Sequence, residues 1–178
     1  MNLSGYKTTH FFIKMIITHT VTYMVMGLMA STIFNYAEMF ADQVYQGYMR
    51  QLNDPIVMAG PLFQPIRGLI FALVLLPFSR VLLEEKRGWL YLWGLLVGIG
   101  ILSTFGPAPG SIEGMIYSNL PVGLNPGGYV EVLLQSLLLS VIFIYWVKHP
   151  EQKWISWVMG VLFVLLITMI TLGLVLAT

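Results

Sequence analysis

The chain has 178 residues, of which 57% are hydrophobic and 10% are charged, and its mean hydropathy is +0.80. Soluble domains carry about a quarter charged residues, so this composition excludes an ordinary soluble protein and predicts a membrane protein. A net charge of +1 gives no basic patch for nucleic acid, and the absence of cysteine excludes disulfides, thiolate metal sites and a thiol nucleophile.

Long apolar runs predict an all-α fold, a polytopic helical membrane bundle that forms a single transmembrane domain over residues 1–178. Continuous runs close to the ~20 residues that cross about 30 Å of hydrocarbon indicate helices, whereas a β-barrel would show short alternating segments. Short interfacial helices are expected on the outer face. Five transmembrane helices are predicted, at about 12–35, 61–83, 89–105, 129–147 and 154–176.

The positions of lysine and arginine predict the orientation, because cytoplasmic loops of membrane proteins are rich in both. All five tryptophans fall at the same predicted interface as these basic residues. The two patterns together predict an N-in, C-out protein of the lipid bilayer, which we place in a bacterial-type cytoplasmic membrane. The basic residues on the predicted inner side are Lys7, Lys14, Arg80, Lys86, Arg87, Lys148 and Lys153.

The first span also has features of a cleaved signal sequence, since Lys7 and Lys14 precede an apolar stretch. Against cleavage, His19, Thr20 and Thr22 interrupt that stretch, and no A-x-A site follows it cleanly. A retained span is therefore favoured. Cleavage would leave four spans with the same orientation.

The second span contains a charge. Asp54 and Pro55 are typical of an N-cap and a first helical position, and Pro61 and Pro65 then predict a kink. Arg67 follows, about 20 Å from Arg80 at about 1.5 Å of rise per residue, which puts it in the outer half of the hydrocarbon. A guanidinium at this depth needs a carboxylate, carbonyls or water.

Glu131 in the fourth span is the partner best matched in depth to Arg67, and Glu113 is the second candidate. The sequence therefore predicts an ion pair and, around it, an outward-facing polar vestibule for a ligand or a polar pathway. A buried ion pair can equally be architectural and fix the register of the helices. The predicted site residues are Arg67, Gln64, Glu131, Gln135 and Glu113.

The segment Phe105–Pro121 carries prolines, glycines and a single carboxylate between two apolar runs. Ser111 is a suitable N-cap for a short helix that extends to about Asn119. We expect this helix to lie flat in the outer interface. A re-entrant segment remains the alternative, provided that its irregular ends are buried in protein or line a wet cavity.

Pairs of small residues predict close contacts between helices. Gly94 and Gly98 form such a pair in the third span, and Gly27 and Ser31 form another in the first. The contacts can be made inside one bundle, within a homo-oligomer, or with a partner in a membrane complex.

No sequence signature of a hydrolase, a nucleotide-binding protein or a metalloprotease is present. We therefore expect no catalytic residues, no metal and no cofactor; haem ligation by histidines is disfavoured because His10 and His19 face nearly opposite sides of a helix. The favoured function is a non-enzymatic small transporter, a channel-like protein or an accessory membrane subunit. The alternative is an intramembrane enzyme that acts on a lipid or isoprenoid through Glu113 and Glu131.

Overall fold

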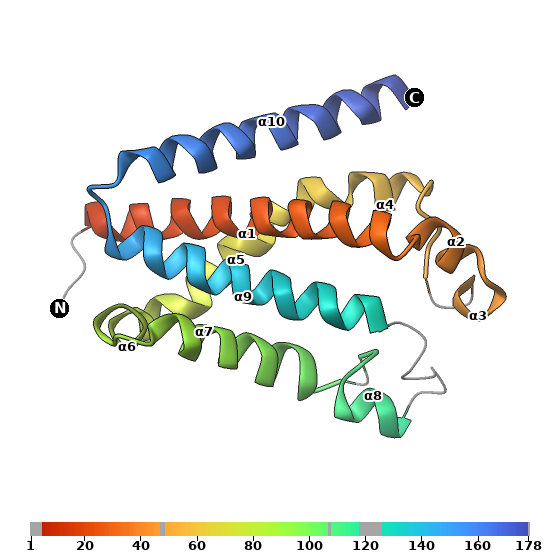
Figure 1. Ribbon diagram of the computed structural model, residues 1–178, viewed down its shortest axis with the longest axis horizontal. Helices are drawn as coiled ribbons and strands as arrows, with labels where there is room; N and C mark the ends of the chain where they lie inside the picture. The colour runs from red at the N-terminus through yellow and green to blue at the C-terminus, as the bar shows by residue number, and fades with distance from the viewer. Residues whose placement is uncertain (1–4, 47–48, 107, 118–125, 178) are drawn as a thin grey trace.

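The computed structural model describes residues 5–46, 49–106, 108–117 and 126–177, and all regular secondary structure in these ranges is helical. Figure 1 shows the long helices running side by side along one axis. The α-helices are α1 (Gly5–Ile33), α2 (Tyr36–Ala41), α3 (Gln43–Gln46), α4 (Pro55–Ala59), α5 (Gln64–Leu75), α6 (Ser79–Glu84), α7 (Gly88–Val97), α8 (Ile112–Tyr117), α9 (Pro126–Lys148) and α10 (Lys153–Ala177). The remaining helical turns are η1 (Gly60–Phe63), η2 (Leu76–Phe78) and the π-helical η3 (Gly98–Leu102).

Within the described ranges, 4 helical segments are long and apolar enough to cross a membrane: Thr8–Ile33, Pro55–Glu84, Gly127–Lys148 and Lys153–Leu176. The expected third span, 89–105, is a shorter apolar helix over Gly88–Leu102, about 22 Å long at about 1.5 Å per residue. Its π-helical last turn ends before Phe105. The described chain is thus an all-helical bundle with four candidate spans and one short apolar helix.

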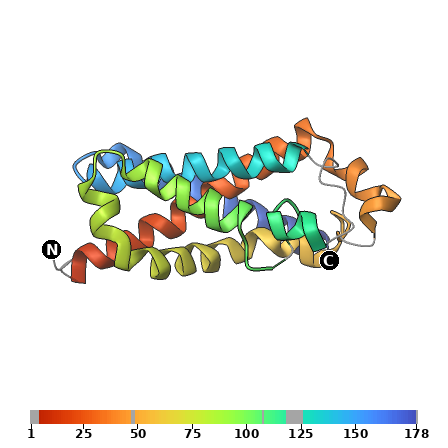
Figure 2. The same cartoon turned by 90° about the horizontal axis from the view of Figure 1, so that it is seen from below.

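Helix α1 forms the centre of the bundle, since α5, α9 and α10 all pack against it. Figure 2 shows α9 along one edge and α5 along the other, with α1 crossing between them. The composition of α1 explains this position, because it buries Thr18, His19, Thr20 and Thr22, polar side chains that are costly to expose to lipid. The hydroxyls of Thr20 and Thr22 donate to carbonyls one turn earlier in the same helix, at 2.8 Å each.

Two of the hydrophobic clusters among the described residues hold the long helices together. The rings of Phe11 and Phe143 meet edge to face with their centroids 5.0 Å apart in a core formed by Phe11, Met15, Ala72, Leu75, Leu82, Leu92, Leu139, Phe143 and Ile144. The second cluster attaches α10 and contains Val21, Trp146, Ile155 and Met159. Beside this cluster, the buried Lys14 donates a hydrogen bond of 2.7 Å from Nζ to the carbonyl oxygen of Trp146. The dipole of that carbonyl stabilises the ammonium charge.

Glycine permits a close contact between α5 and α1 at Gly68, whereas the predicted pair in α7 makes no such contact among the described residues. A Cβ added at Gly68 would lie 2.7 Å from the Cα of Ile16, so α5 and α1 can approach this closely only because residue 68 lacks a side chain. At Gly94 and Gly98, an added Cβ meets no described atom within 4 Å. This pair therefore makes no close helix contact inside the described part of the bundle, and contact with a second copy or another partner stays a prediction.

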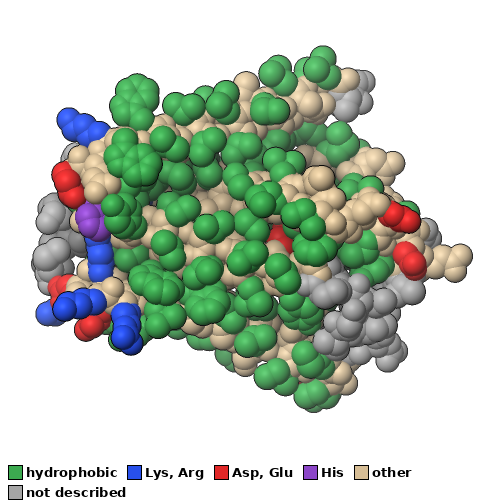
Figure 3. All heavy atoms as spheres, viewed as in Figure 1, with side chains coloured by type: hydrophobic (Ala, Val, Ile, Leu, Met, Phe, Trp, Pro, Cys, Tyr) green, Lys and Arg blue, Asp and Glu red, His purple; other side chains and the backbone are tan. Residues whose placement is uncertain are grey.

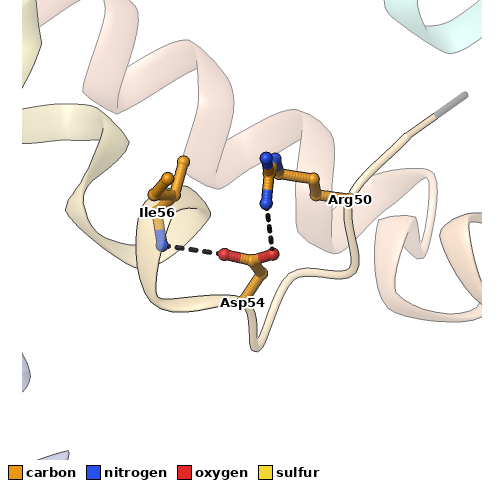
Figure 4. A network of polar contacts seen from close by, with 3 residues as sticks. All are labelled: Arg50, Asp54 and Ile56. Carbon is orange, nitrogen blue, oxygen red and sulfur yellow. Dashed lines mark hydrogen bonds and ion pairs between the residues drawn. The ribbon is translucent and has the colours of Figure 1, made fainter.

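The second span begins as its sequence predicts. Asp54 caps α4, because its Oδ1 accepts a hydrogen bond of 2.9 Å from the amide of Ile56, while Arg50 donates from Nη1 to Oδ2 at 3.0 Å (Figure 4). The Ile56 amide first, and then Arg50, hold the pKa of the Asp54 carboxyl below its usual value. Between Pro61 and Pro65 the α-helix gives way to η1, so the predicted irregularity is confirmed.

Short helices lie at the end of the bundle where α1 ends and α9 begins (Figure 1). Asn35 adopts a left-handed conformation (φ 47°) between α1 and α2, which turns the chain sharply there. Ser111 caps α8 as predicted, because its Oγ accepts a hydrogen bond of 3.0 Å from the amide of Gly114. Position 107 and the predicted end of this helix near Asn119 lie outside the described residues.

Charged side chains are concentrated at the two ends of the molecule, and hydrophobic side chains cover most of the face between them (Figure 3). In this view the lysine and arginine side chains gather at one end, with some acidic groups among them. The charged side chains at the opposite end are acidic. This distribution is that of a bundle whose middle faces hydrocarbon.

Candidate functional site

A small polar cluster joins α5 to α1. Arg67 donates from Nη1 to Oε1 of Gln64 at 3.2 Å, and Nε2 of His19 lies 3.2 Å from the same oxygen. Gln64 also donates from Nε2 to the carbonyl of Gly60 at 3.2 Å, which fixes its amide at the turn η1. Cζ of Arg67 also lies 5.8 Å from the centroid of the Tyr23 ring, in the range of a cation–π contact.

The predicted ion pair of Arg67 is wrong. The ion pairs present among the described residues are Arg50–Asp54 and Arg80–Glu84, and neither Glu131 nor Glu113 lies within pairing distance of Arg67. The physical reason is that equal depth does not imply proximity: α5 and α9 each pack against α1, which crosses between them (Figure 2). In place of a carboxylate, Arg67 has a neutral amide oxygen and an aromatic ring.

Glu131 has its own neutral partner. The hydroxyl of Tyr36 donates to Oε2 of Glu131 at 2.6 Å, which ties α2 to α9 across the end of α1. Burial, and then this hydrogen bond, raise the pKa of Tyr36 above its usual value. The other carboxylate oxygen lies beside α1, because a Cβ added at Gly27 would be 3.6 Å from Oε1.

The remaining predicted site residues are not drawn into either cluster. Gln135 lies one turn beyond Glu131 on α9, and Glu113 lies in the first turn of α8. Neither side chain forms a hydrogen bond or ion pair with another residue in the described ranges. The predicted vestibule is therefore divided into an Arg67–Gln64 cluster and a separate Glu131 carboxylate, and the role of these residues in binding remains a prediction.

Three aromatic or histidine residues at these clusters were not predicted as site residues. His19 lies beside Gln64 and is almost fully buried, with no hydrogen bond at Nδ1 within the described part of the chain. The other two are Tyr23, beside Arg67, and Tyr36, which donates to Glu131. The available signal was the run of polar side chains inside the first span, which pointed to a protein-facing surface.

Other features of the surface do not coincide with these clusters. An open groove of about 530 Å³ lies along α10 and contains none of the predicted site residues. It is lined by Ser156, Trp157, Gly160, Val161, Val164 and Leu165, a surface suited to lipid. Across the described residues, no group of three or more His, Asp or Glu side chains is placed to hold a metal ion.

Comparison of the chain with protein families, with curated proteins and with solved structures finds no match. Any functional inference therefore depends on the arrangement of these polar residues within the helical bundle.

Proposed function

We propose that the chain crosses a bacterial-type cytoplasmic membrane five times, with its N-terminus inside and its C-terminus outside, and that Gly88–Leu102 is a short fifth span that locally thins the bilayer. The gathering of basic side chains at one end of the molecule supports this orientation (Figure 3). The cysteine-free chain permits a direct test. Asn53→Cys should react with a membrane-impermeant maleimide in intact cells, and Lys86→Cys only after permeabilisation; the reverse pattern would overturn the orientation.

We further propose that the protein is a non-enzymatic membrane component, either a small transporter or channel-like protein or an accessory subunit, which binds an anionic group at Arg67. The observation that carries this proposal is that Arg67 has no carboxylate partner among the described residues. A guanidinium offers five N–H donors, and the contact with Gln64 uses one of them. An always-charged group about 20 Å from the inner boundary is strongly stabilised when an anion occupies the remaining donors.

The test compares wild-type protein, Arg67→Gln and Arg80→Gln, purified in a non-ionic detergent. Arg80 is the matched control because it has the same charge and is already paired with Glu84 at 3.2 Å. Melting temperatures are measured with and without inorganic phosphate and phosphatidylglycerol, two anions of different size. At least one anion should stabilise the wild type and Arg80→Gln but not Arg67→Gln, by about 3 kcal/mol at 100 times Kd.

An equal response of all three proteins would show that Arg67 is structural. We do not advance the lipid-modifying enzyme as a second function, because no contact joins Glu113 to Glu131 in the described ranges. Their expected cooperation as an acid and a base requires the two carboxyl groups to meet around one substrate.

A further inference from the structure

Two opposite charges lie against one face of α1. Tyr23 and Gly27 are four positions apart and therefore share a face, separated by about 6 Å along the helix axis. Helix α5 places the Arg67 guanidinium 5.8 Å from the Tyr23 ring centroid. Helix α9 places Oε1 of Glu131 beside Gly27, 3.6 Å from an added Cβ. A cation and an anion thus approach the same strip of α1 from two different helices.

Neither charge is neutralised by the other or by any other ion among the described residues. Arg67 has the amide oxygen of Gln64, and Glu131 has the hydroxyl of Tyr36. The Tyr23 ring lies 5.8 Å from Cζ of Arg67, and its hydroxyl makes no hydrogen bond in the described part of the chain. Because unpaired charges at this depth are costly, a ligand with two separated opposite charges would relieve both at once without adding net charge.

The geometry points to a zwitterionic ligand whose ammonium group binds Glu131 and whose phosphate binds Arg67, and we propose the ethanolamine headgroup of a phospholipid as this ligand. This inference rests on the proposed function, since it assigns the anion at Arg67 to a lipid phosphate. A primary ammonium has three N–H donors, whereas a choline headgroup has none to offer Glu131. Oε1 of Glu131 makes no hydrogen bond within the described residues, because the Tyr36 hydroxyl donates to Oε2, so Oε1 can accept from such a donor.

The order of the two charges favours a lipid over a soluble zwitterion. Gly27 is nearer than Tyr23 to Ile33, where α1 ends, so Glu131 lies nearer the membrane surface and Arg67 lies deeper. A phospholipid has the same order, since its phosphate lies between the ammonium and acyl chains that descend into the hydrocarbon. Around Arg67, exposed apolar side chains of η1 and α5 can contact such chains: Phe63, Ile66 and Ile70.

The experiment is native mass spectrometry of the purified protein in an equimolar mixture of phosphatidylethanolamine and phosphatidylglycerol with identical acyl chains. The wild type should retain mainly phosphatidylethanolamine. Glu131→Gln should shift the ratio toward phosphatidylglycerol by at least tenfold, because the ammonium loses its carboxylate while the phosphate keeps Arg67. Glu113→Gln is the matched control, since it removes a carboxylate outside this strip, and it should leave the wild-type ratio unchanged.

Each contrary result has a separate meaning. Suppose that Glu131→Gln and the wild type bind the two lipids in the same ratio while Arg67→Gln loses both lipids. The proposal of a zwitterionic ligand is then refuted, and the proposed anion site at Arg67 is supported. If Arg67→Gln retains both lipids like the wild type, the proposed function is overturned as well. If Glu131→Gln fails to fold, Gly27→Leu decides: it fills the space beside Glu131 without changing a charge, and an unchanged ratio would refute the inference.

A final arm separates the lipid from a soluble source of the same chemistry. Glycerophosphoethanolamine carries the headgroup without acyl chains, and it should neither displace the bound lipid nor raise the melting temperature at millimolar concentration. Displacement of the lipid by this compound would overturn the assignment to a phospholipid and identify a soluble zwitterion as the ligand.

Discussion

Replacing Gly68 by alanine tests how tightly α5 and α1 are packed. The added Cβ would lie 2.7 Å from Cα, 3.2 Å from the carbonyl oxygen and 3.4 Å from the carbonyl carbon of Ile16. Ordinary contact begins at about 3.4 Å and above, so the helices must separate by roughly 1 Å. These are backbone atoms, which cannot rotate away as a side chain can. The same separation stretches the contact between His19 and Gln64, which is already 3.2 Å long.

The magnitude follows from three contributions. Overpacking costs about 1–3 kcal/mol, the weakened hydrogen bond costs about 1 kcal/mol, and alanine regains about 1 kcal/mol of helix propensity relative to glycine. We therefore expect Gly68→Ala to lose about 1–3 kcal/mol. For a chain of this size that corresponds to a melting temperature lower by on the order of 5 °C.

The assay is thermal unfolding of the detergent-purified protein, followed by its tryptophan fluorescence. Gly94→Ala is the matched control, since a Cβ at Gly94 meets no described atom within 4 Å, and it should be neutral or stabilised by up to about 1 kcal/mol. Trimming Ile16 to alanine should not rescue Gly68→Ala, because the clash is with main-chain atoms. The packing argument is refuted if Gly68→Ala melts at or above the wild-type temperature.

Two further predictions concern the end of the bundle where α1 ends and the second span begins. The Ile56 amide keeps the pKa of Asp54 below 3.8, so the charged cap stabilises the fold above that pH and loses its effect as the pH falls through the folded-state pKa. The melting-temperature advantage of wild type over Asp54→Asn, which caps without titrating, should shrink on acidification; a constant difference would contradict it. Tyr36→Phe removes the donor to Glu131 and should cost about 1 kcal/mol in thermal unfolding. Tyr145→Phe, which loses an exposed hydrogen bond, should cost nothing, and equal losses would refute the assignment.

Features that depend on neighbouring residues were predicted correctly from the sequence. The Asp54 cap, the break between Pro61 and Pro65 and the Ser111 cap each follow from side-chain chemistry within about one helical turn. The long apolar spans were predicted for a similar reason, since length and hydropathy are properties of the segment itself. The third span was predicted to extend to Phe105, whereas the π-helical turn η3 ends the helix at Leu102, just before the polar residues Ser103 and Thr104.

Contacts between helices could not be predicted in the same way. Depth along the membrane axis matched Arg67 to Glu131. Whether two side chains meet also depends on where each helix packs around α1, and the sequence does not give that position. The glycines show the same limit: Gly68 and Gly94 are both in apolar helices, and among the described residues an added Cβ meets the backbone of another helix at Gly68 and no atom within 4 Å at Gly94. A small residue permits a close contact but does not determine which helix makes it.

The polarity of α1 accounts for both the architecture and the candidate site. A helix that carries threonines and a histidine in the middle of a span is poorly soluble in lipid, so it is stabilised when other helices surround it, as α5, α9 and α10 do here. Once α1 is central, charges on two surrounding helices are directed at its surface and not at each other. Arg67 and Glu131 are then separated by the strip of α1 that contains Tyr23 and Gly27. The same packing that prevents their ion pair creates a site with two separate charges, which is why a zwitterion fits it better than a simple anion.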